Sequence, residues 1–179
     1  MELTLGEWRR CGSVTTGALV LMLQDLWPGA GWGLIDSLGE PKSPWYALKR
    51  ACRPLQVLLS DEGLEGLAVH VVNETNVART LRPSLQCLRR GATPVIDTQT
   101  DIELGPRSAL RMTSTQIIGS FFDITNAYRF GPPAHDVTIA TSGRWSPTIC
   151  SATTTAISTN GRYLWDWTLG PCQGRPASG

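Results

Sequence analysis

The sequence has little charge and no long apolar run, and each shortage excludes a class of protein. Charged residues make up 17% of the 179 residues, and 16 Lys and Arg against 15 Asp and Glu leave a formal net charge of +1. A dedicated nucleic-acid-binding protein carries a basic face, so nucleic acid is not an expected partner. The longest apolar run, residues 18–23, is far shorter than the roughly 20 residues that span a bilayer, so no membrane span is expected.

The cysteines lack any C-x-x-C pair. An odd number without regular spacing fits neither a zinc site nor a disulfide framework, so the sequence predicts buried free thiols, no metal site and no cofactor. The five are Cys11, Cys52, Cys87, Cys150 and Cys172. The histidines, His70 and His135, stand alone and are interpreted as partly buried strand residues. Residues 1–4 have neither the basic start nor the apolar run of a secretory signal, and no compartment is assigned.

Residues 1–53 have the pattern of one β/α unit. Residues 17–23 are apolar without polar alternation, which is typical of a parallel strand covered on both faces. A loop rich in Gly and Trp follows at 24–36, and a helix is predicted at 43–53 with Ser43 as its cap. A parallel strand needs neighbours on both sides. This segment is therefore expected either to dock on another protein or to begin in the middle of a larger domain.

Residues 54–141 have a different pattern, with short β runs at intervals of roughly 8–12 residues that indicate an antiparallel sandwich. The expected strands lie at residues 55–59, 67–73, 80–88, 94–104, 108–112 and 135–141. Residues 114–124 interrupt this pattern and are interpreted as a short crossover with Ile117, Ile118 and Phe121 pointing inward. Beyond them, residues 142–179 are rich in Ser and Thr and are predicted to form a poorly ordered tail.

Several long strings carry a family resemblance. The first are Asp25-Leu-Trp-Pro-Gly-Ala-Gly-Trp-Gly-Leu-Ile-Asp36, Gly39-Glu-Pro-Lys42 and Trp45-Tyr-Ala-Leu-Lys-Arg50. They resemble the end of the catalytic barrel in glycoside hydrolase family 2, nearest to the bacterial β-mannosidase branch. Further along, Val69-His-Val-Val-Asn73 and Ala127-Tyr-Arg-Phe-Gly-Pro-Pro-Ala-His-Asp136 resemble the immunoglobulin-like domain that follows that barrel.

The resemblance implies a mainly β fold, an immunoglobulin-like antiparallel sandwich preceded by the last β/α unit of a (β/α)8 barrel. Residues 1–53 are then the end of the barrel, 54–141 the sandwich and 142–179 an atypical tail. The loop at 24–36 would lie at the face of the barrel where active sites are built. Because the tail departs from the family's pattern, a reading-frame change near Ser142 is a further hypothesis.

Trp27 and Asp25 are the predicted substrate-binding residues. In the family, a tryptophan at the position of Trp27 forms a wall of the pocket for the terminal mannosyl unit, and sugar C–H faces pack well on aromatic rings. Core packing beside Pro28 is the alternative for Trp27. Asp25 is interpreted either as holding a sugar hydroxyl or as ordering the loop. Trp32 and Trp45 are interpreted as packing residues.

No residue of this chain is predicted to be catalytic. Retaining glycoside hydrolysis needs two carboxyl groups about 5–5.5 Å apart. In the family these are glutamates after the fourth and seventh barrel strands, which would lie before Met1. Asn73-Glu74 imitates the family's Asn-Glu pair but falls inside the sandwich segment, so Glu74 is not assigned that role.

The sequence therefore predicts a C-terminal fragment of a β-mannosidase-like glycoside hydrolase, which hydrolyses terminal β-D-mannosyl residues in the intact family. The fragment alone is predicted to be inactive, and its partner in the intact enzyme would be a β-mannoside or oligosaccharide. A non-catalytic module that binds carbohydrate or protein is the alternative. A third hypothesis is a poorly folding remnant without function. Oligomeric state is not assigned.

Overall fold

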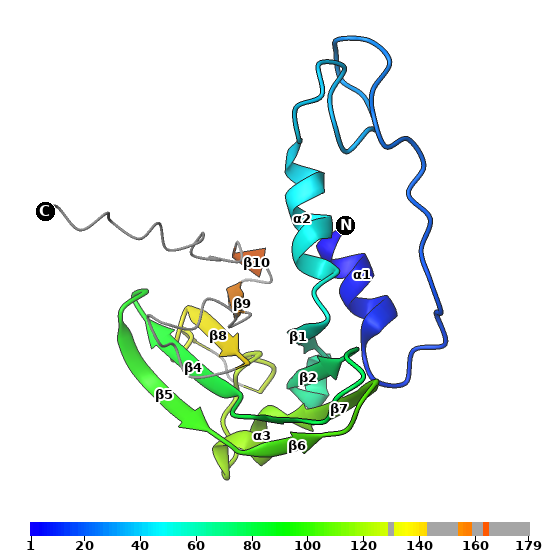
Figure 1. Ribbon diagram of the computed structural model, residues 1–179. Helices are drawn as coiled ribbons and strands as arrows, with labels where there is room; N and C mark the ends of the chain where they lie inside the picture. Colours follow the sequence, from blue (N-terminus) through cyan, green and yellow to red (C-terminus); the bar gives the residue numbers. More distant parts are fainter. Residues whose placement is uncertain (129–130, 143–153, 159–162, 165–179) are drawn as a thin grey trace, which may run out of the picture.

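The computed structural model describes residues 1–128, 131–142, 154–158 and 163–164. Within them the chain is mainly β, and every ladder between named strands is antiparallel (Figure 1). None of the helices in these residues has the length and apolar character needed to cross a bilayer. The coarse prediction of a mainly β, antiparallel chain is thus confirmed.

The first sheet has the strand order β1-β2-β7. It consists of β1 (Leu55–Asp61), β2 (Leu67–Asn73) and β7 (Ser108–Thr113), with the 3-10 turn η1 (Gly63–Glu65) between β1 and β2. All residues of the central strand β2 are buried. Its apolar run without alternation therefore reflects a strand that is covered on both faces.

The second sheet has the order β10-β9-β8-β4-β5. Its strands are β4 (Ser84–Arg89), β5 (Thr93–Gln99), β8 (Val137–Thr141), β9 (Thr154–Ser158) and β10 (Tyr163–Leu164). A small separate sheet pairs β3 (Arg79–Leu81) with β6 (Ile102–Leu104). The expected strands at 80–88 and 94–104 are therefore each divided into two shorter strands.

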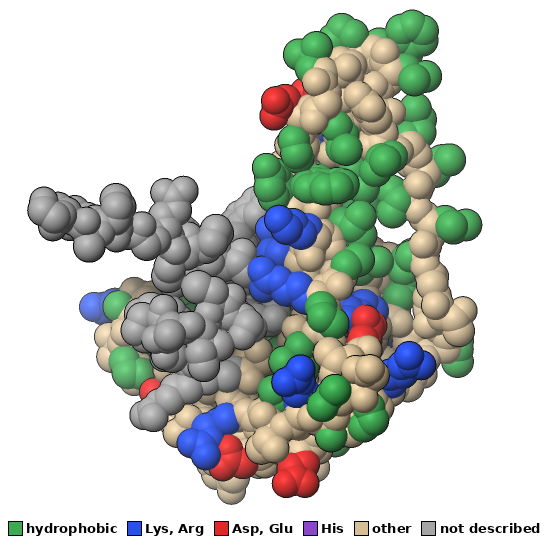
Figure 2. All heavy atoms as spheres, viewed as in Figure 1, with side chains coloured by type: hydrophobic (Ala, Val, Ile, Leu, Met, Phe, Trp, Pro, Cys, Tyr) green, Lys and Arg blue, Asp and Glu red, His purple; other side chains and the backbone are tan. Residues whose placement is uncertain are grey.

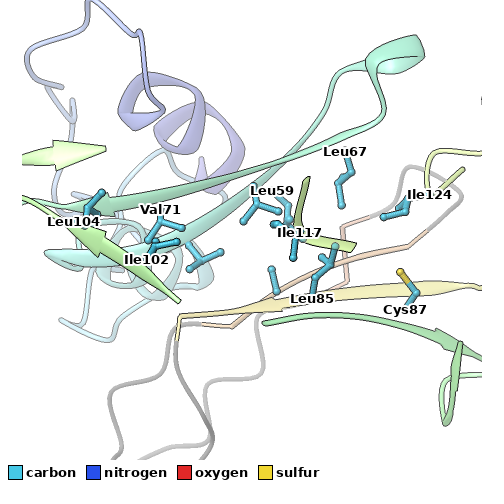
Figure 3. Close-up of a cluster of buried hydrophobic side chains, with 12 residues drawn as sticks. Leu59, Leu67, Val71, Leu85, Cys87, Ile102, Leu104, Ile117 and Ile124 are labelled. Carbon is cyan, nitrogen blue, oxygen red and sulfur yellow. The ribbon is translucent and has the colours of Figure 1, made fainter. Parts of the chain in front are cut away.

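The core lies between the two larger sheets, as the close-up in Figure 3 shows. Leu59 and Val71 come from the first sheet, whereas Leu85, Cys87 and Ala140 come from the second. The small sheet adds Ile102 and Leu104, and the segment after β7 adds Ile117 and Ile124. Burying an aliphatic side chain of this size contributes roughly 1.5–3 kcal/mol, so this cluster is a main source of stability.

The crossover predicted at 114–124 contains a short helix, α3 (Ser114–Ile118). Thr113 and Gln116 form a capping box, in which each side chain accepts a hydrogen bond from the other residue's backbone N–H. Ile117 is buried and Ile118 partly buried, as predicted. The inward position predicted for Phe121 is wrong: its side chain is 70% exposed, because it follows the left-handed Gly119 and packs edge-on against Tyr128.

Two helices, α1 (Glu2–Arg9) and α2 (Ser43–Ala51), pack against each other on the side of the first sheet (Figure 1). The predicted helix at 43–53 is therefore present, with its end two residues earlier. The prediction that Ser43 caps it is wrong, because Ser43 is already the first helical residue. Lys42 is the N-cap, and its side chain makes no capping bond.

The strand predicted at residues 17–23 is not a strand in the described part of the chain. Leu19 is fully exposed and Leu21 is 89% exposed. A strand needs neighbours that satisfy its backbone N–H and C=O groups, and the described residues supply no ladder to this run. The run instead extends beside the helices, and hydrophobic side chains gather over this part of the surface in Figure 2.

The predicted tail and thiols are each corrected in part. Two segments of the tail, Thr154–Ser158 and Tyr163–Leu164, are the strands β9 and β10, and the β-branched Thr and Ile of β9 suit a strand. Residues 143–153, 159–162 and 165–179 lie outside the described residues, as do Cys150 and Cys172. Of the other cysteines, Cys87 is a buried free thiol as predicted, whereas Cys11 and Cys52 are exposed.

Candidate functional site

The candidate site is the loop that precedes α2, and backbone hydrogen bonds fold it back on itself. The N–H groups of Leu34 and Ile35 both donate to the carbonyl of Leu23, each over 3.0 Å. The N–H of Asp25 donates to the carbonyl of Ile35, and that of Lys42 to the carbonyl of Leu34, each over 2.9 Å. Leu34 is 1% exposed at the centre of these bonds. The two ends of the loop are therefore fixed to each other.

Asp25 is the buried carboxylate of this loop, with 6% of its surface exposed. Oδ1 accepts a 2.7 Å hydrogen bond from the N–H of Gly33, and Oδ2 accepts a 2.6 Å bond from Nζ of Lys42. Lys42 also donates to the carbonyl of Gly31 over 2.9 Å. The Lys42 bond, and then the Gly33 bond, hold the pKa of Asp25 below its usual value. These contacts are those of a residue that orders the loop.

The glycines beside Asp25 make room for its carboxylate. A Cβ at Gly31 would lie 2.2 Å from Oδ1 of Asp25, and a Cβ at Gly33 would lie 2.6 Å from the same oxygen. Both distances are far shorter than any non-bonded contact that proteins adopt. The Gly-x-Gly spacing of the loop is therefore explained by the close approach of Asp25.

The tryptophans of the loop point into solvent. Trp27 is 77% exposed and Trp32 is 90% exposed, whereas Trp45 on α2 is partly buried. The alternative that Trp27 packs in a core beside Pro28 is contradicted by its exposure. The packing role predicted for Trp32 is also wrong for the described residues, because nothing in them covers its ring. A stiff loop that carries large exposed aromatic rings is suited to binding an apolar face of a ligand.

Both histidines are more deeply buried than the partly buried strand residues predicted, and His135 precedes β8 rather than lying in it, whereas His70 lies in β2. His70 also belongs to a network that the sequence analysis missed. Nε2 of His70 lies 2.9 Å from Oγ of Ser60, and that hydroxyl donates to Glu62 over 2.6 Å. Since Ser60 has one proton and donates it to the carboxylate, Nε2 of His70 must carry the proton that Ser60 accepts. Glu62 also accepts a 3.1 Å hydrogen bond from Arg10, the C-cap residue of α1. This series of hydrogen bonds is a structural link between α1 and the first sheet.

Glu74 follows β2 and forms an ion pair with Arg9, whose Nε lies 2.9 Å from its Oε1. An open groove of about 320 Å³ lies beside it, lined by Val72, Asn73, Glu74, Arg107, Ser108 and Ala109. No residue of the loop at 24–36 lines this groove, and it presents no aromatic ring. It is therefore separate from the predicted substrate-binding residues. Among the residues that the structure describes, no cluster of His, Cys, Asp and Glu could hold a metal ion.

The residues that sequence reasoning missed are Lys42 and Arg9, which hold the loop and the helices in place. Lys42 lies in a string that carried the family resemblance, but its pairing with Asp25 over 17 positions has no local pattern. Arg9 acts across 65 positions to reach Glu74. The register of the β1–β2 hairpin was the one available indication for the His70 network. Leu58 pairs with His70, and Ser60, two residues after Leu58, lies on the same face of β1 and therefore near His70.

Comparisons with known proteins relate the chain to glycosidases. No family model matches. Beta-mannosidase B of Emericella nidulans is 38% identical over 52 residues, which are 29% of this chain and 6% of that protein. Beta-mannosidase B of Aspergillus oryzae matches with the same identity and the same coverage. The match thus spans only a small part of these curated relatives.

Solved structures give wider but more distant matches. The β-D-mannosidase of Dictyoglomus thermophilum aligns with a TM-score of 0.58 and 21% identity, covering 78% of this chain and 16% of that one. The exo-chitosanase of Amycolatopsis orientalis aligns with a TM-score of 0.52 and 17% identity, covering 91% of this chain and 16% of that one. At these identities the likeness concerns the fold. Together the comparisons confirm the resemblance to the C-terminal portion of glycoside hydrolase family 2 proteins.

Proposed function

We propose that this chain supplies the end of the catalytic barrel and the following immunoglobulin-like sandwich of a β-mannosidase-like glycoside hydrolase. The observation that carries the proposal is the match to Beta-mannosidase B at 38% identity over 52 residues. In this proposal residues 1–53 are the last β/α unit of the barrel, residues 54–141 are the sandwich, and residues 142–179 are an atypical tail whose strands β9 and β10 extend the second sheet. Two antiparallel sheets that face each other across a shared core support the sandwich assignment.

The exposed apolar run at residues 17–23 supports the barrel assignment. Its side chains include Leu19 and Leu21, which are 101% and 89% exposed. A strand inside a parallel barrel is covered by side chains on one face, by helices on the other, and by hydrogen-bonded strands at both edges. We assign the run as the eighth barrel strand, which becomes a strand when the neighbouring strands are present.

In the proposed enzyme Trp27 is a wall of the pocket that receives a terminal β-mannosyl unit. The exposed indole ring offers a flat apolar surface to the C–H face of a sugar. Asp25 acts on the substrate indirectly, because both of its oxygens already accept hydrogen bonds from Gly33 and Lys42. The loop is thereby held in one shape before the sugar arrives, which lowers the entropy cost of binding.

The chain is proposed to shape the site without performing the chemistry. A retaining glycosidase needs a nucleophile and an acid/base, two carboxyl groups about 5–5.5 Å apart. Asp25 is tied to Lys42, and Glu74 is tied to Arg9 at the end of the sandwich strand β2. Neither is placed to act as one of such a pair. The isolated 179-residue chain is therefore proposed to hydrolyse no mannoside.

A loop graft tests the binding role. Residues 24–36 would replace the aligned loop of the β-D-mannosidase of Dictyoglomus thermophilum, and hydrolysis of p-nitrophenyl β-D-mannoside would be measured. We expect the graft to remain active and Trp27→Ala within it to raise KM about tenfold, the loss expected for one stacking contact. Trp32→Ala is the matched control and is expected to change KM less. An unchanged KM in the Trp27→Ala graft would contradict the proposal.

Inactivity of the isolated chain is tested separately with the same chromogenic mannoside. No release of p-nitrophenol is expected. Turnover that disappears in Glu74→Ala would show that the chain has its own catalytic carboxylate.

The exposure of Trp27 and Trp32 also favours a second candidate, a non-catalytic module that binds carbohydrate or protein. Titration of the isolated chain with manno-oligosaccharides, followed by tryptophan fluorescence, distinguishes the two functions. Saturable quenching by the isolated chain that persists in the Trp27→Ala variant supports the module. Absence of quenching in the isolated chain supports the subsite role, which needs the rest of the barrel.

A further inference from the structure

Arg9, at the end of α1, makes more contacts than any side chain of the candidate site. Its Nε lies 2.9 Å from Oε1 of Glu74, and one terminal nitrogen donates to the carbonyl of Arg53 over 2.7 Å. The other terminal nitrogen donates to Oε1 of Gln56 over 2.5 Å and to the carbonyl of Ala51. The side chain is only 14% exposed. All three nitrogens of the guanidinium are therefore used.

These contacts join three separate elements. Ala51 is the last residue of α2, so its carbonyl is one of those at the helix end that have no partner within the helix, and Arg53 lies just beyond the C-cap Cys52. Gln56 lies in β1, and Glu74 follows β2. The positive charge of Arg9 also suits the C-terminal end of the α2 dipole. One side chain of α1 thus fixes the C-terminal end of α2 to the first sheet.

The opposite end of α2 holds the candidate loop. Lys42 is the N-cap residue of α2, and its Nζ lies 2.6 Å from the Asp25 carboxylate. Its backbone N–H donates to Leu34 over 2.9 Å. Between these two anchors α2 has nine residues, a stiff rod of roughly 14 Å at the rise of an α-helix. Figure 1 shows α2 between β1 at one end and the loop at the other.

We propose that Arg9 is a positioning residue, which fixes the orientation of the Trp27 loop relative to the sandwich through α2. The path runs from Glu74 to Arg9, along α2 to Lys42, and from Lys42 to Asp25 in the loop. The relevance of this orientation for a sugar rests on the proposed function, but the orientation itself does not. Lysine in place of Arg9 would keep the charge beside Glu74 and lose the fork that reaches Ala51, Arg53 and Gln56.

Arg10 provides a matched control within the same helix end. Among the described residues its ion pairs are to Glu7 over 2.9 Å and to Glu62 over 3.1 Å, neither of which belongs to α2, so they link α1 to the first sheet. If docking of α1 alone set the orientation of the loop, the two arginines would be equivalent. If Arg9 acts through α2, only substitution of Arg9 changes the orientation of the loop.

A distance measurement between two spin labels tests the proposal on the full chain. Cys11, Cys52, Cys150 and Cys172 are replaced by Ser, which leaves the buried Cys87. Labels are then attached at Leu26→Cys in the loop and Leu64→Cys in η1, where the native side chains are 73% and 70% exposed. We expect one narrow distance distribution, at least twofold broader in Arg9→Met, unchanged in Arg10→Met and intermediate in Arg9→Lys.

A narrow distribution in Arg9→Met, or equal broadening in both methionine variants, overturns the proposal. If Arg9→Met fails to fold, Glu74→Ala decides, because it removes the acceptor of the Arg9 Nε–H and lies outside both helices. Broadening in Glu74→Ala supports the proposal, and an unchanged distribution overturns it. No sugar enters this experiment, so its failure is distinct from failure of the mannoside-binding role of Trp27.

Discussion

The ammonium group of Lys42 lies 2.6 Å from the carboxylate of Asp25. This ion pair joins the beginning of the candidate loop to the N-cap residue of α2. The carboxylate is 5% exposed and the lysine side chain 28% exposed, so the pair is shielded from solvent on one side. Because the other carboxylate oxygen accepts from Gly33, the pair and the backbone of the loop form one unit.

Asp25→Ala is expected to loosen this loop while leaving the sandwich intact. The N–H of Gly33 loses its acceptor, so its hydrogen exchange is expected to become about tenfold faster or more, measured by NMR. Asp61→Ala is the control, because Asp61 accepts in the same way from Gly63 in the β1–β2 connection. That variant is expected to leave exchange at Gly33 unchanged. Equal exchange rates at Gly33 in wild type and Asp25→Ala would count against the ordering role of Asp25.

Gly31→Ala is also expected to accelerate hydrogen exchange at Gly33, but through a steric clash. The added Cβ would lie 2.2 Å from Oδ1 of Asp25, so the carboxylate must move away from Lys42 and Gly33. Gly17→Ala is the matched control, since nothing lies within 4 Å of its Cβ position. Exchange at Gly33 is expected to accelerate in Gly31→Ala alone. If both alanine variants behave alike, the close approach of Asp25 does not constrain the loop.

The buried histidines predict how stability depends on pH. Burial lowers the pKa of His70 and of His135 below the 6.5 of an exposed histidine. As pH falls through 6.5, the unfolded chain binds protons that the folded chain does not, so the free energy of unfolding falls. The folded state is therefore most stable above pH 6.5. Below that pH its free energy of unfolding falls by at most about 1.4 kcal/mol per pH unit for each histidine.

Urea denaturation between pH 5 and pH 8 measures that slope. His70→Gln is expected to reduce it, and the double variant with His135→Gln to reduce it further. Glu62 has a pKa lowered from 4.5, mainly by the Ser60 hydroxyl, so its contribution is lost only at lower pH and does not mask the effect. A slope that both variants leave unchanged would refute the assignment.

The core predicts a large cost for Leu85→Ala. Leu85 is 0% exposed in the cluster between the two sheets, and truncation of a buried leucine costs about 2–5 kcal/mol. Leu64→Ala, at a leucine that is 70% exposed, is the control and is expected to change stability by less than about 0.5 kcal/mol. Chemical denaturation measures both. Similar midpoints for the two variants would argue against the described core.

The thiols are expected to react at very different rates with a disulfide reagent such as DTNB. Cys11 and Cys52 are exposed, whereas burial raises the pKa of Cys87 to about 11. Thiolate is the reactive form, so Cys87 is expected to react only when the chain unfolds. Mass spectrometry of the labelled protein identifies the modified residues. Labelling of Cys87 under native conditions at the rate of Cys11 would contradict its burial.

The strands at 55–59 and 67–73 were predictable from sequence because their apolar residues are contiguous and turn residues separate them. The helix at 43–53 was predictable from Pro44 and from the basic residues near its end, although its first residue was misassigned. The exposed position of Phe121 was not predictable from sequence. Gly119, in the left-handed conformation, redirects the chain after α3, and the spacing of apolar residues does not indicate such a turn.

The site was predictable in its residues and not in its contacts. Trp27 and Asp25 were selected by resemblance, and the structure places both in one ordered loop, with the tryptophan exposed and the carboxylate buried. Pairing of Asp25 with Lys42, and of Arg9 with Glu74, depends on how α1 and α2 dock. Contacts between residues far apart in sequence follow from tertiary structure, and local patterns do not encode them.

The exposed run at 17–23 also bears on how the protein is made. Ribosomes add about 5–20 residues per second. This apolar segment is therefore synthesised on the order of ten seconds before β8. During that interval its leucines are open to any hydrophobic surface in the cell. Holdase chaperones bind chains in such a state. We therefore expect the yield of folded protein to depend on what binds this segment during translation.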